Sequence, residues 1–132
     1  MNRLAKKIFE ANKKKGFWTN NPKERNFGEV IALCHSELSE ALEADRKGVS
    51  ASLETFEFLN QNPQEMGNIE EVNELFKNTF KTYIKDTKED ELADTIIRVL
   101  DYCGAMNIDI DRHIELKLRY NETRENKHGK RF

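Results

Sequence analysis

Residues 88–106 read KEDELADTIIRVLDYCGAM, and this segment gives the clearest indication of the fold. Its apolar residues return every three or four positions, at Leu92, Ile96, Val99 and Cys103. That period is typical of an α-helix with one side against a core. We therefore predict a helix here with those four residues facing inward. The polar residues on one flank of this helix are Glu91, Asp94, Arg98, Asp101 and Tyr102.

The sequence on both sides of this stretch has the same helical period. We predict further helices over 2–15, 27–47 and 109–124, with Gly16 and Gly48 ending the first two. Asp109 is expected to cap the last of them. The apolar stripe of the 27–47 helix is made of Phe27, Val30, Ile31, Cys34, Leu38, Ala41 and Leu42.

Residues 49–86 have a weaker pattern. We predict a short helix, a break at Asn62-Pro63-Gln64 and then a longer helix. The longer helix is indicated by the spacing of Ile69, Val72, Phe76, Phe80 and Tyr83.

The composition also favours helices. Charged residues make up 35% of the 132, and only six glycines and two prolines interrupt them. This length fits one domain with a modest core, so we predict a single domain over 1–132. The predicted fold class is all-α, a helical bundle of about five helices.

Charge and cysteine content exclude several classes of protein. With 22 basic and 24 acidic residues, the net charge of −2 gives no field that would attract a nucleic acid polymer or an anionic membrane. No apolar run is long enough to span a bilayer, and no signal-peptide pattern follows Met1. Cys34 and Cys103 both fall on apolar stripes, which indicates core thiols in a reduced, cytoplasmic protein.

Two acidic motifs give the strongest sign of chemistry. They are ELSE at 37–40 and ELAD at 91–94, and each places two carboxylates three residues apart on one helix face. A single pair of this kind is usually a solvated surface feature. Two pairs that flank the core stripes predict a divalent-cation site formed by Glu37, Glu40, Glu91 and Asp94. Oxygen ligands suit Mg²⁺ or Mn²⁺, and neither motif supplies the Glu-x-x-His of a ferritin-like di-iron site.

A basic and polar face follows on the 109–124 helix. Lys117, Asn121 and Arg124 are spaced by four and three residues, so they share one side. They could neutralise a polyphosphate and hydrogen-bond a ribose or base. Taken alone, they fit better with a cationic last turn that complements the helix dipole.

Two other side chains have open roles. Trp18, the only tryptophan, could stack on a base, but core filling is the commoner role for a lone tryptophan. Arg98 could pair with Asp94 or Asp101, or could contact a phosphate.

This combination of motifs resembles the MazG-like all-α nucleoside triphosphate pyrophosphohydrolases. The resemblance covers roughly residues 12–48 and 88–131, and it is strongest in DELAD at 90–94. It rests on Glu-x-x-Glu, then Glu-x-x-Asp, then Lys-x-x-x-Asn-x-x-Arg, each on its own helix.

The resemblance implies an activity and a role for each residue of these motifs. Glu37, Glu40, Glu91 and Asp94 would hold Mg²⁺, with Mn²⁺ as a substitute, on a nucleoside triphosphate. Glu37 and Glu40 would be the catalytic pair, with Glu40 positioning the attacking water. The remaining roles would be phosphate and sugar binding by Lys117, Asn121 and Arg124, and base contact by Trp18. The reaction would release nucleoside monophosphate and pyrophosphate, and members of the family commonly form dimers or tetramers.

One feature departs from the compact members of that family. Fifty residues separate Glu40 from Glu91, so residues 49–86 form an insertion. Its apolar residues are Phe56, Phe58, Phe76 and Phe80. We expect them to form part of an oligomer interface that completes the bundle, with a lid over the nucleotide as the second possibility.

Three other functions remain open. The first is a non-enzymatic protein that binds nucleotide or metal on the same bundle and regulates a partner. The second is a purely structural bundle, and the third is a phosphoribosyl-ATP pyrophosphohydrolase.

Overall fold

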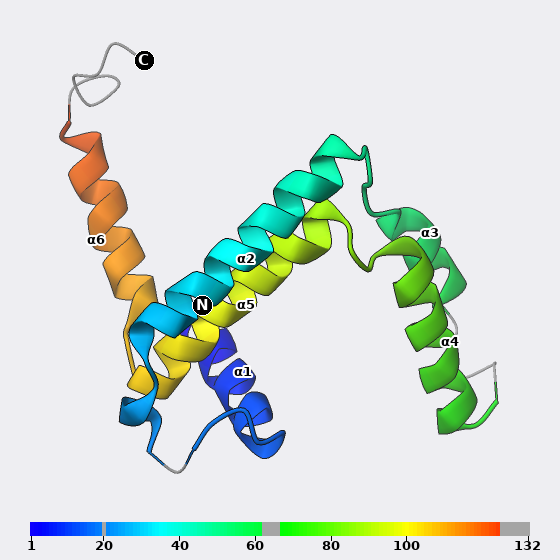
Figure 1. The fold of residues 1–132 in the computed structure, drawn as a ribbon, viewed down its shortest axis with the longest axis horizontal. Coiled ribbons are helices and arrows are strands. Elements are labelled where there is room, and N and C mark those ends of the chain that lie inside the picture. The colour runs from blue at the N-terminus through cyan, green and yellow to red at the C-terminus, as the bar shows by residue number, and fades with distance from the viewer. Residues whose placement is uncertain (20, 62–66, 125–132) are drawn as a thin grey trace. The chain divides into compact units, whose positions relative to one another are not determined.

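The chain folds into helices only, as expected from its sequence. The computed structural model describes residues 1–19, 21–61 and 67–124, and this part contains no strand. Six α-helices and one short 3₁₀-helix follow one another along it (Figure 1). They are α1 (Asn2–Lys14), η1 (Pro22–Glu24), α2 (Phe27–Arg46), α3 (Leu53–Leu59), α4 (Ile69–Tyr83), α5 (Lys88–Met106) and α6 (Ile110–Glu122). Within the described ranges, no helix has the length and apolar character needed to cross a membrane.

Most helix ends lie within two residues of the predicted ones. The backbone turns into the left-handed region at Gly16 (φ +84°) and at Gly48 (φ +68°), just past the ends of α1 and α2. Glycine takes this conformation without a steric penalty, which is why it stops both helices. Asp109 caps α6 as predicted, because its carboxylate accepts a hydrogen bond from the Arg112 amide at 3.1 Å.

The chain divides into two compact units. The first contains residues 1–26 with the described part of 99–132, and the second contains residues 27–98. Helix α5 contributes its last residues to the first unit and its first residues to the second. Since the acidic motifs at 37–40 and 91–94 both belong to the second unit, that unit positions the candidate site.

The first unit is built where α1 packs on the C-terminal part of α5. Its core is Ala5, Leu100 and Cys103, and Leu100 is only 1% exposed. Gly104 lets the two helices approach closely, because a Cβ at that position would come within 2.4 Å of the Ala5 carbonyl oxygen. Ile8, Ile108 and Ile110 pack around the edge of this core.

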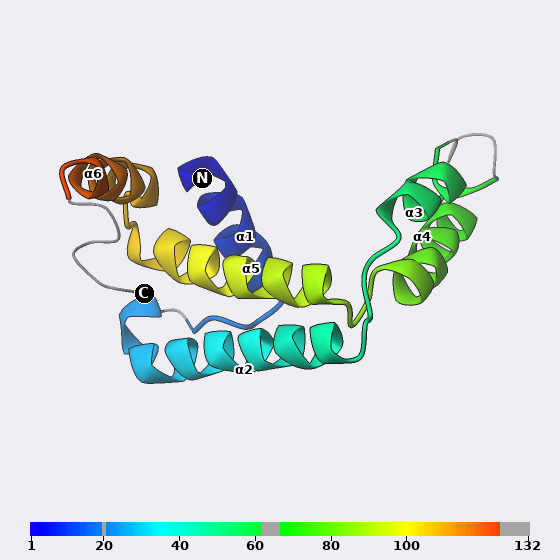
Figure 2. The same cartoon turned by 90° about the horizontal axis from the view of Figure 1, so that it is seen from above.

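In the second unit, α2 and the part of α5 up to Arg98 lie side by side, as both views show (Figure 1, Figure 2). The inner face of α2 is formed mainly by small side chains, and one acidic residue lies among them. The buried residues of α2 are Val30, Cys34, Glu37, Ala41 and Ala44. Cys34 and Cys103 are both buried free thiols, which confirms that they are core residues.

The predicted inward faces of α2 and α5 were wrong for the largest side chains. Phe27, Ile31, Leu38 and Leu42 on α2 are exposed, and so are Leu92, Ile96 and Val99 on α5. The apolar stripe of α2 is wide, and packing selects its small-residue side because small residues let two helices approach closely. The large aliphatic residues are left on the neighbouring face.

The insertion folds as the predicted short and longer helices, α3 and α4. The break expected at Asn62-Pro63-Gln64 lies outside the described residues. The side chain of Asn68 caps α4 by accepting hydrogen bonds from two backbone amides, and Glu71 completes the capping box. The amide of Ser52 donates to the carbonyl of Tyr83 at 2.9 Å, which joins the two open ends of the helix pair.

An aromatic cluster holds α3 against α4. The ring of Phe56 meets those of Phe76 and Phe80 edge-on, with centroids 5.5 and 6.2 Å away. The insertion therefore covers part of its own apolar face, which the sequence had led us to expect against a partner. Phe58 stays 68% exposed and Phe76 51% exposed.

Candidate metal centre

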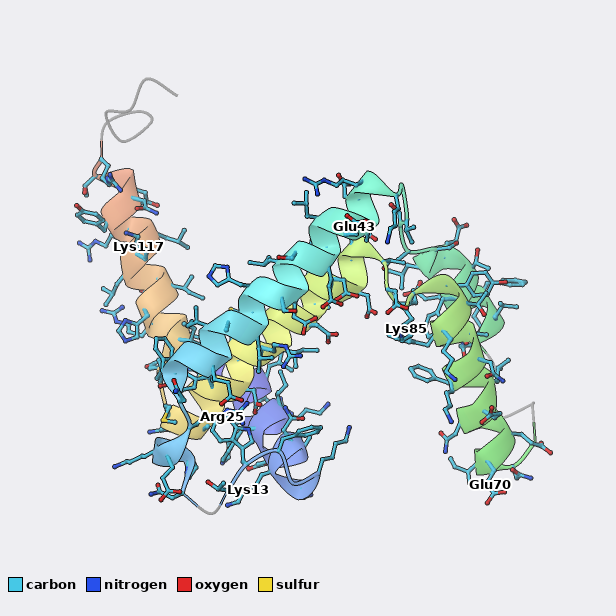
Figure 3. All side chains as sticks on the ribbon, in the orientation of Figure 1. Lys13, Arg25, Glu43, Glu70, Lys85 and Lys117 are labelled. Carbon is cyan, nitrogen blue, oxygen red and sulfur yellow. The ribbon has the colours of Figure 1, made fainter. Side chains whose placement is uncertain are left out.

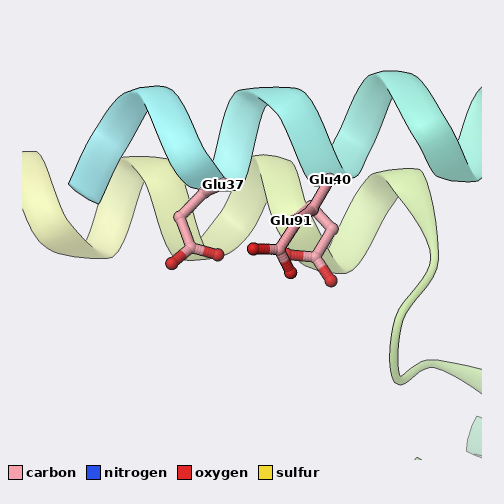
Figure 4. Close-up of side chains that lie close together, drawn as sticks. All are labelled: Glu37, Glu40 and Glu91. Carbon is pink, nitrogen blue, oxygen red and sulfur yellow. The ribbon is translucent and has the colours of Figure 1, made fainter. Parts of the chain in front are cut away.

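Three carboxylates of the second unit come together between α2 and α5 (Figure 4). Glu37 and Glu40 are offered by α2 and Glu91 by α5, and one oxygen from each lies within 4.8 Å of the others. Glu37 and Glu91 are each 6% exposed, whereas Glu40 is exposed. Three oxygen ligands, without nitrogen or sulfur, are the donor set that Mg²⁺ and Mn²⁺ prefer.

Glu37 reaches the site because it occupies a core position of its helix. It lies one turn after Cys34 and one turn before Ala41, both buried on the same face. Glu40, one turn further along, lies at the edge of that face. The hydroxyl of Ser36 donates to Oε1 of Glu40 at 3.2 Å and helps to orient it. Sequence reasoning missed Ser36, although its i, i+4 spacing to Glu40 is visible in the sequence.

Asp94 stands apart from the three clustered carboxylates. It is exposed and does not belong to the group whose oxygens lie within 4.8 Å of one another. Desolvation raises its pKa most, and the charges of Asp90, Glu37 and Glu40 raise it further. The predicted four-carboxylate cluster thus contains three carboxylates here, and Asp94 is coupled to it only through charge.

Glu91 carries the largest electrostatic perturbation of the cluster. Burial raises its pKa to about 7, and a hydrogen bond to Glu37 and the charges of Glu40, Glu37 and Asp90 add to the effect. Near neutral pH, and without a cation, this carboxyl therefore keeps its proton for much of the time. A divalent cation would release that proton, because the metal binds the carboxylate form.

Arg98 supplies positive charge at the same place. Its Nε donates to Oε1 of Glu37 at 2.7 Å, and its Nη2 lies 2.5 Å from the same oxygen. Glu37 is therefore the ion-pair partner of Arg98, whereas the sequence had suggested Asp94 or Asp101. The pKa of Asp94 is raised overall, and the positive charge of Arg98 opposes part of that rise.

Trp18 is anchored inside the first unit. Its indole Nε1 donates to both carboxylate oxygens of Asp101, at 3.1 and 3.0 Å. Phe9 packs edge-on against the ring, with centroids 5.5 Å apart, and the guanidinium of Arg25 lies 5.6 Å from the ring centroid. These contacts fix the ring of Trp18 on Asp101 and Phe9, and its contact with a base stays a prediction.

The predicted phosphate-binding residues lie at the C-terminal end of α6, also in the first unit. Lys117 projects from this helix (Figure 3), with its Nζ 5.3 Å from the ring centroid of Tyr120. Arg124 follows the end of α6, and its Cζ lies 5.8 Å from the same ring. Lys117 and Arg124 thus both lie near the ring of Tyr120, and the next residue, Asn121, is half-buried. The predicted helix reached Arg124, two residues too far.

No protein-family model, curated protein or solved structure matches this chain.

Proposed function

We propose that this chain is a nucleoside triphosphate pyrophosphohydrolase of the MazG-like type. It would hydrolyse a (deoxy)nucleoside triphosphate between the α- and β-phosphates and would remove unwanted nucleotides from the cellular pool. The observation that carries this proposal is the convergence of Glu37, Glu40 and Glu91 within 4.8 Å. Two of these carboxylates are buried, and Arg98 pairs with only one of them, so a cation would let Glu91 ionise as well.

The acidic residues would have two roles, metal binding and positioning of the attacking water. Glu37, Glu40 and Glu91 would hold Mg²⁺ or Mn²⁺, and Asp94 would add a ligand at the edge. The cation would polarise the phosphate oxygens and lower the pKa of a bound water. Glu40 would position the attacking water with Glu37, since it is the exposed member of the cluster and is oriented by Ser36.

The residues proposed to bind the nucleotide are those that the resemblance to the MazG-like family implies. Lys117 and Arg124 would bind the phosphates, Asn121 would bind the sugar, and Trp18 would flank the base. The two cations beside the exposed ring of Tyr120 suit a polyanion, because a guanidinium and an ammonium pair well with phosphate. A homodimer or homotetramer in the cytoplasm, acting on free nucleotides rather than a nucleic acid polymer, completes the proposal.

Pyrophosphate release is the direct test. The purified chain should liberate pyrophosphate from at least one member of a panel of nucleoside triphosphates, and EDTA should abolish the release. A panel with no turnover would reject the enzyme. Nucleotide binding and metal-stabilised melting without product would instead favour the non-enzymatic regulatory protein.

Substitutions within the site test its assignment. Glu40→Gln and Asp94→Asn should each lower kcat by about 100-fold or more, as loss of a metal ligand or water-positioning group commonly does. Helicity by circular dichroism should not change. Glu43→Gln is the matched control, because Glu43 is an exposed acid of α2 whose ion pairs, with Lys47 at 3.4 Å and Arg46 at 4.0 Å, lie on the surface. Full activity in both site variants would show that the site is wrongly assigned.

A further inference from the structure

Arg98 and Glu37 form an ion pair between α5 and α2. The guanidinium contacts Oε1 of Glu37 through both Nε and Nη2. The Glu37 side chain is 9% exposed and the Arg98 side chain 39% exposed. The arginine is thus the more exposed partner of a largely buried carboxylate.

Charge explains why an arginine occupies this position. Three carboxylates within 4.8 Å of one another repel strongly in a partly buried setting. One guanidinium on Glu37 offsets part of that repulsion in the absence of metal. A divalent ion on the same carboxylates would offset more of it and would repel the guanidinium in turn.

We infer that Arg98 is a resident counter-ion of the cluster, holding Glu37 in the metal-free protein and giving it up when a divalent cation binds. This inference rests on the proposed metal centre, and in it Arg98 competes with the divalent cation for Glu37. Arg98 thereby keeps the acidic faces of α2 and α5 folded together without metal. The cost is weaker cation binding, because the metal must replace an existing ion pair.

Mn²⁺ binding tests the inference without any nucleotide. The chain and its Arg98→Met variant are titrated with Mn²⁺ at about pH 8.5, and free Mn²⁺ is followed by electron paramagnetic resonance. This pH lies above the Glu91 pKa of about 7, so proton competition is reduced. We expect Arg98→Met to bind Mn²⁺ about tenfold more tightly, because one competing positive charge is gone.

Two variants serve as controls. Arg98→Lys keeps the charge and should bind Mn²⁺ about as the unmodified chain does. Arg46→Met removes an exposed arginine of α2 that lies 4.0 Å from Glu43, and it should have no effect. Binding by Arg98→Met that is unchanged or weaker would overturn the inference. Tighter binding by Arg98→Lys as well would also overturn it, since charge would then not be the cause.

A second measurement needs no variant that might fail to fold. The Nε–H signal of Arg98 in the unmodified chain can be followed by ¹⁵N NMR during a Mg²⁺ titration. Loss of the 2.7 Å hydrogen bond to Glu37 should shift this signal and speed its exchange with water. A signal that Mg²⁺ leaves unchanged contradicts release of Arg98, even if Mg²⁺ binds. Absence of any metal binding would instead remove the metal centre and the proposed function together.

Discussion

Glu91 is the residue at which the electrostatic cost of the carboxylate cluster is greatest. It is 6% exposed and shares a hydrogen bond with Glu37, and its pKa is raised from 4.5 to about 7. The folded chain therefore holds this proton over a pH range in which the unfolded chain has already lost it. Metal binding and protein stability should both depend on that difference.

The metal-free chain should lose stability as pH rises from about 4.5 to about 7, and this dependence should level off above the pKa of Glu91. In that range the folded state binds more protons than the unfolded state, so the free energy of unfolding falls with pH. Glu91→Gln should flatten this dependence and, at about pH 8 in EDTA, should melt several degrees higher than the unmodified chain. Thermal melts at several pH values measure the effect.

The matched control for that prediction is Glu43→Gln, which changes an exposed carboxylate on α2. It should leave the pH dependence as it is. Mg²⁺ should raise the melting temperature of the unmodified chain and of Glu43→Gln, but much less that of Glu91→Gln. If Glu91→Gln keeps the original pH dependence, Glu91 does not hold the proton.

At the scale of helices, the contact between α1 and α5 depends on one missing side chain. A Cβ on Gly104 would lie 2.4 Å from the carbonyl oxygen of Ala5 and 2.9 Å from the Cβ of Phe9. The first of these is backbone and cannot rotate away. Close approach at Gly104 is thus what allows Ala5 and Cys103 to share a core.

Gly104→Ala should therefore destabilise the protein by about 1–3 kcal/mol, the usual cost of overpacking. Helix propensity alone would predict the opposite change in the free energy of unfolding, because alanine is the more stabilising helix residue by about 1 kcal/mol. Chemical denaturation measures the free energy of unfolding. Ala93→Gly, at an exposed position in the same helix, reports the propensity effect by itself. A stabilised Gly104→Ala would show that α1 does not pack here as described.

The faces of α2 and α5 show how packing chooses among apolar residues. The side of α2 against α5 carries Cys34, Ala41 and Ala44 around Glu37. Small residues bring the two backbones close enough for glutamates of both helices to meet. Larger residues at these positions would separate the helices and with them the ligands.

At the scale of the whole molecule, much apolar surface is exposed. Leu38 and Leu42 on α2 and Ile96 on α5 are 44%, 51% and 51% exposed, and Phe58 of the insertion is 68% exposed. We expect exposed aliphatic residues in such numbers to include an interaction surface. The expected homo-oligomer would cover them.

Charged substitutions can locate this interface. Leu38→Glu with Leu42→Glu should convert an oligomer into monomers if the interface lies on α2, since burying two carboxylates costs several kcal/mol. Deleting residues 51–82, or making Phe58→Glu, should do so if the insertion contributes, as its sequence suggested. Light scattering gives the mass. An oligomer that survives the deletion unchanged would contradict an interface role for the insertion.

The helices and the residue types of the candidate site can be predicted from local sequence patterns alone. The 3.6-residue period and the glycines at 16 and 48 act within one or two turns, so they can be recognised without a neighbouring helix. The same is true of the Glu-x-x-Glu and Glu-x-x-Asp spacings, which are set by a single helix. Local rules were therefore enough for the all-α fold and for the pairing of acids within each helix.

Which helix faces are buried, and which carboxylates meet, depends instead on packing between helices. A wide apolar stripe has two usable sides, and the choice depends on how closely the partner helix can approach. As a result, Glu37 and Glu91 are buried, whereas Leu38 and Leu92 are exposed. The same packing brings Arg98 within hydrogen-bond distance of Glu37. Such contacts join residues more than fifty positions apart, so their energies depend on packing rather than on any local pattern.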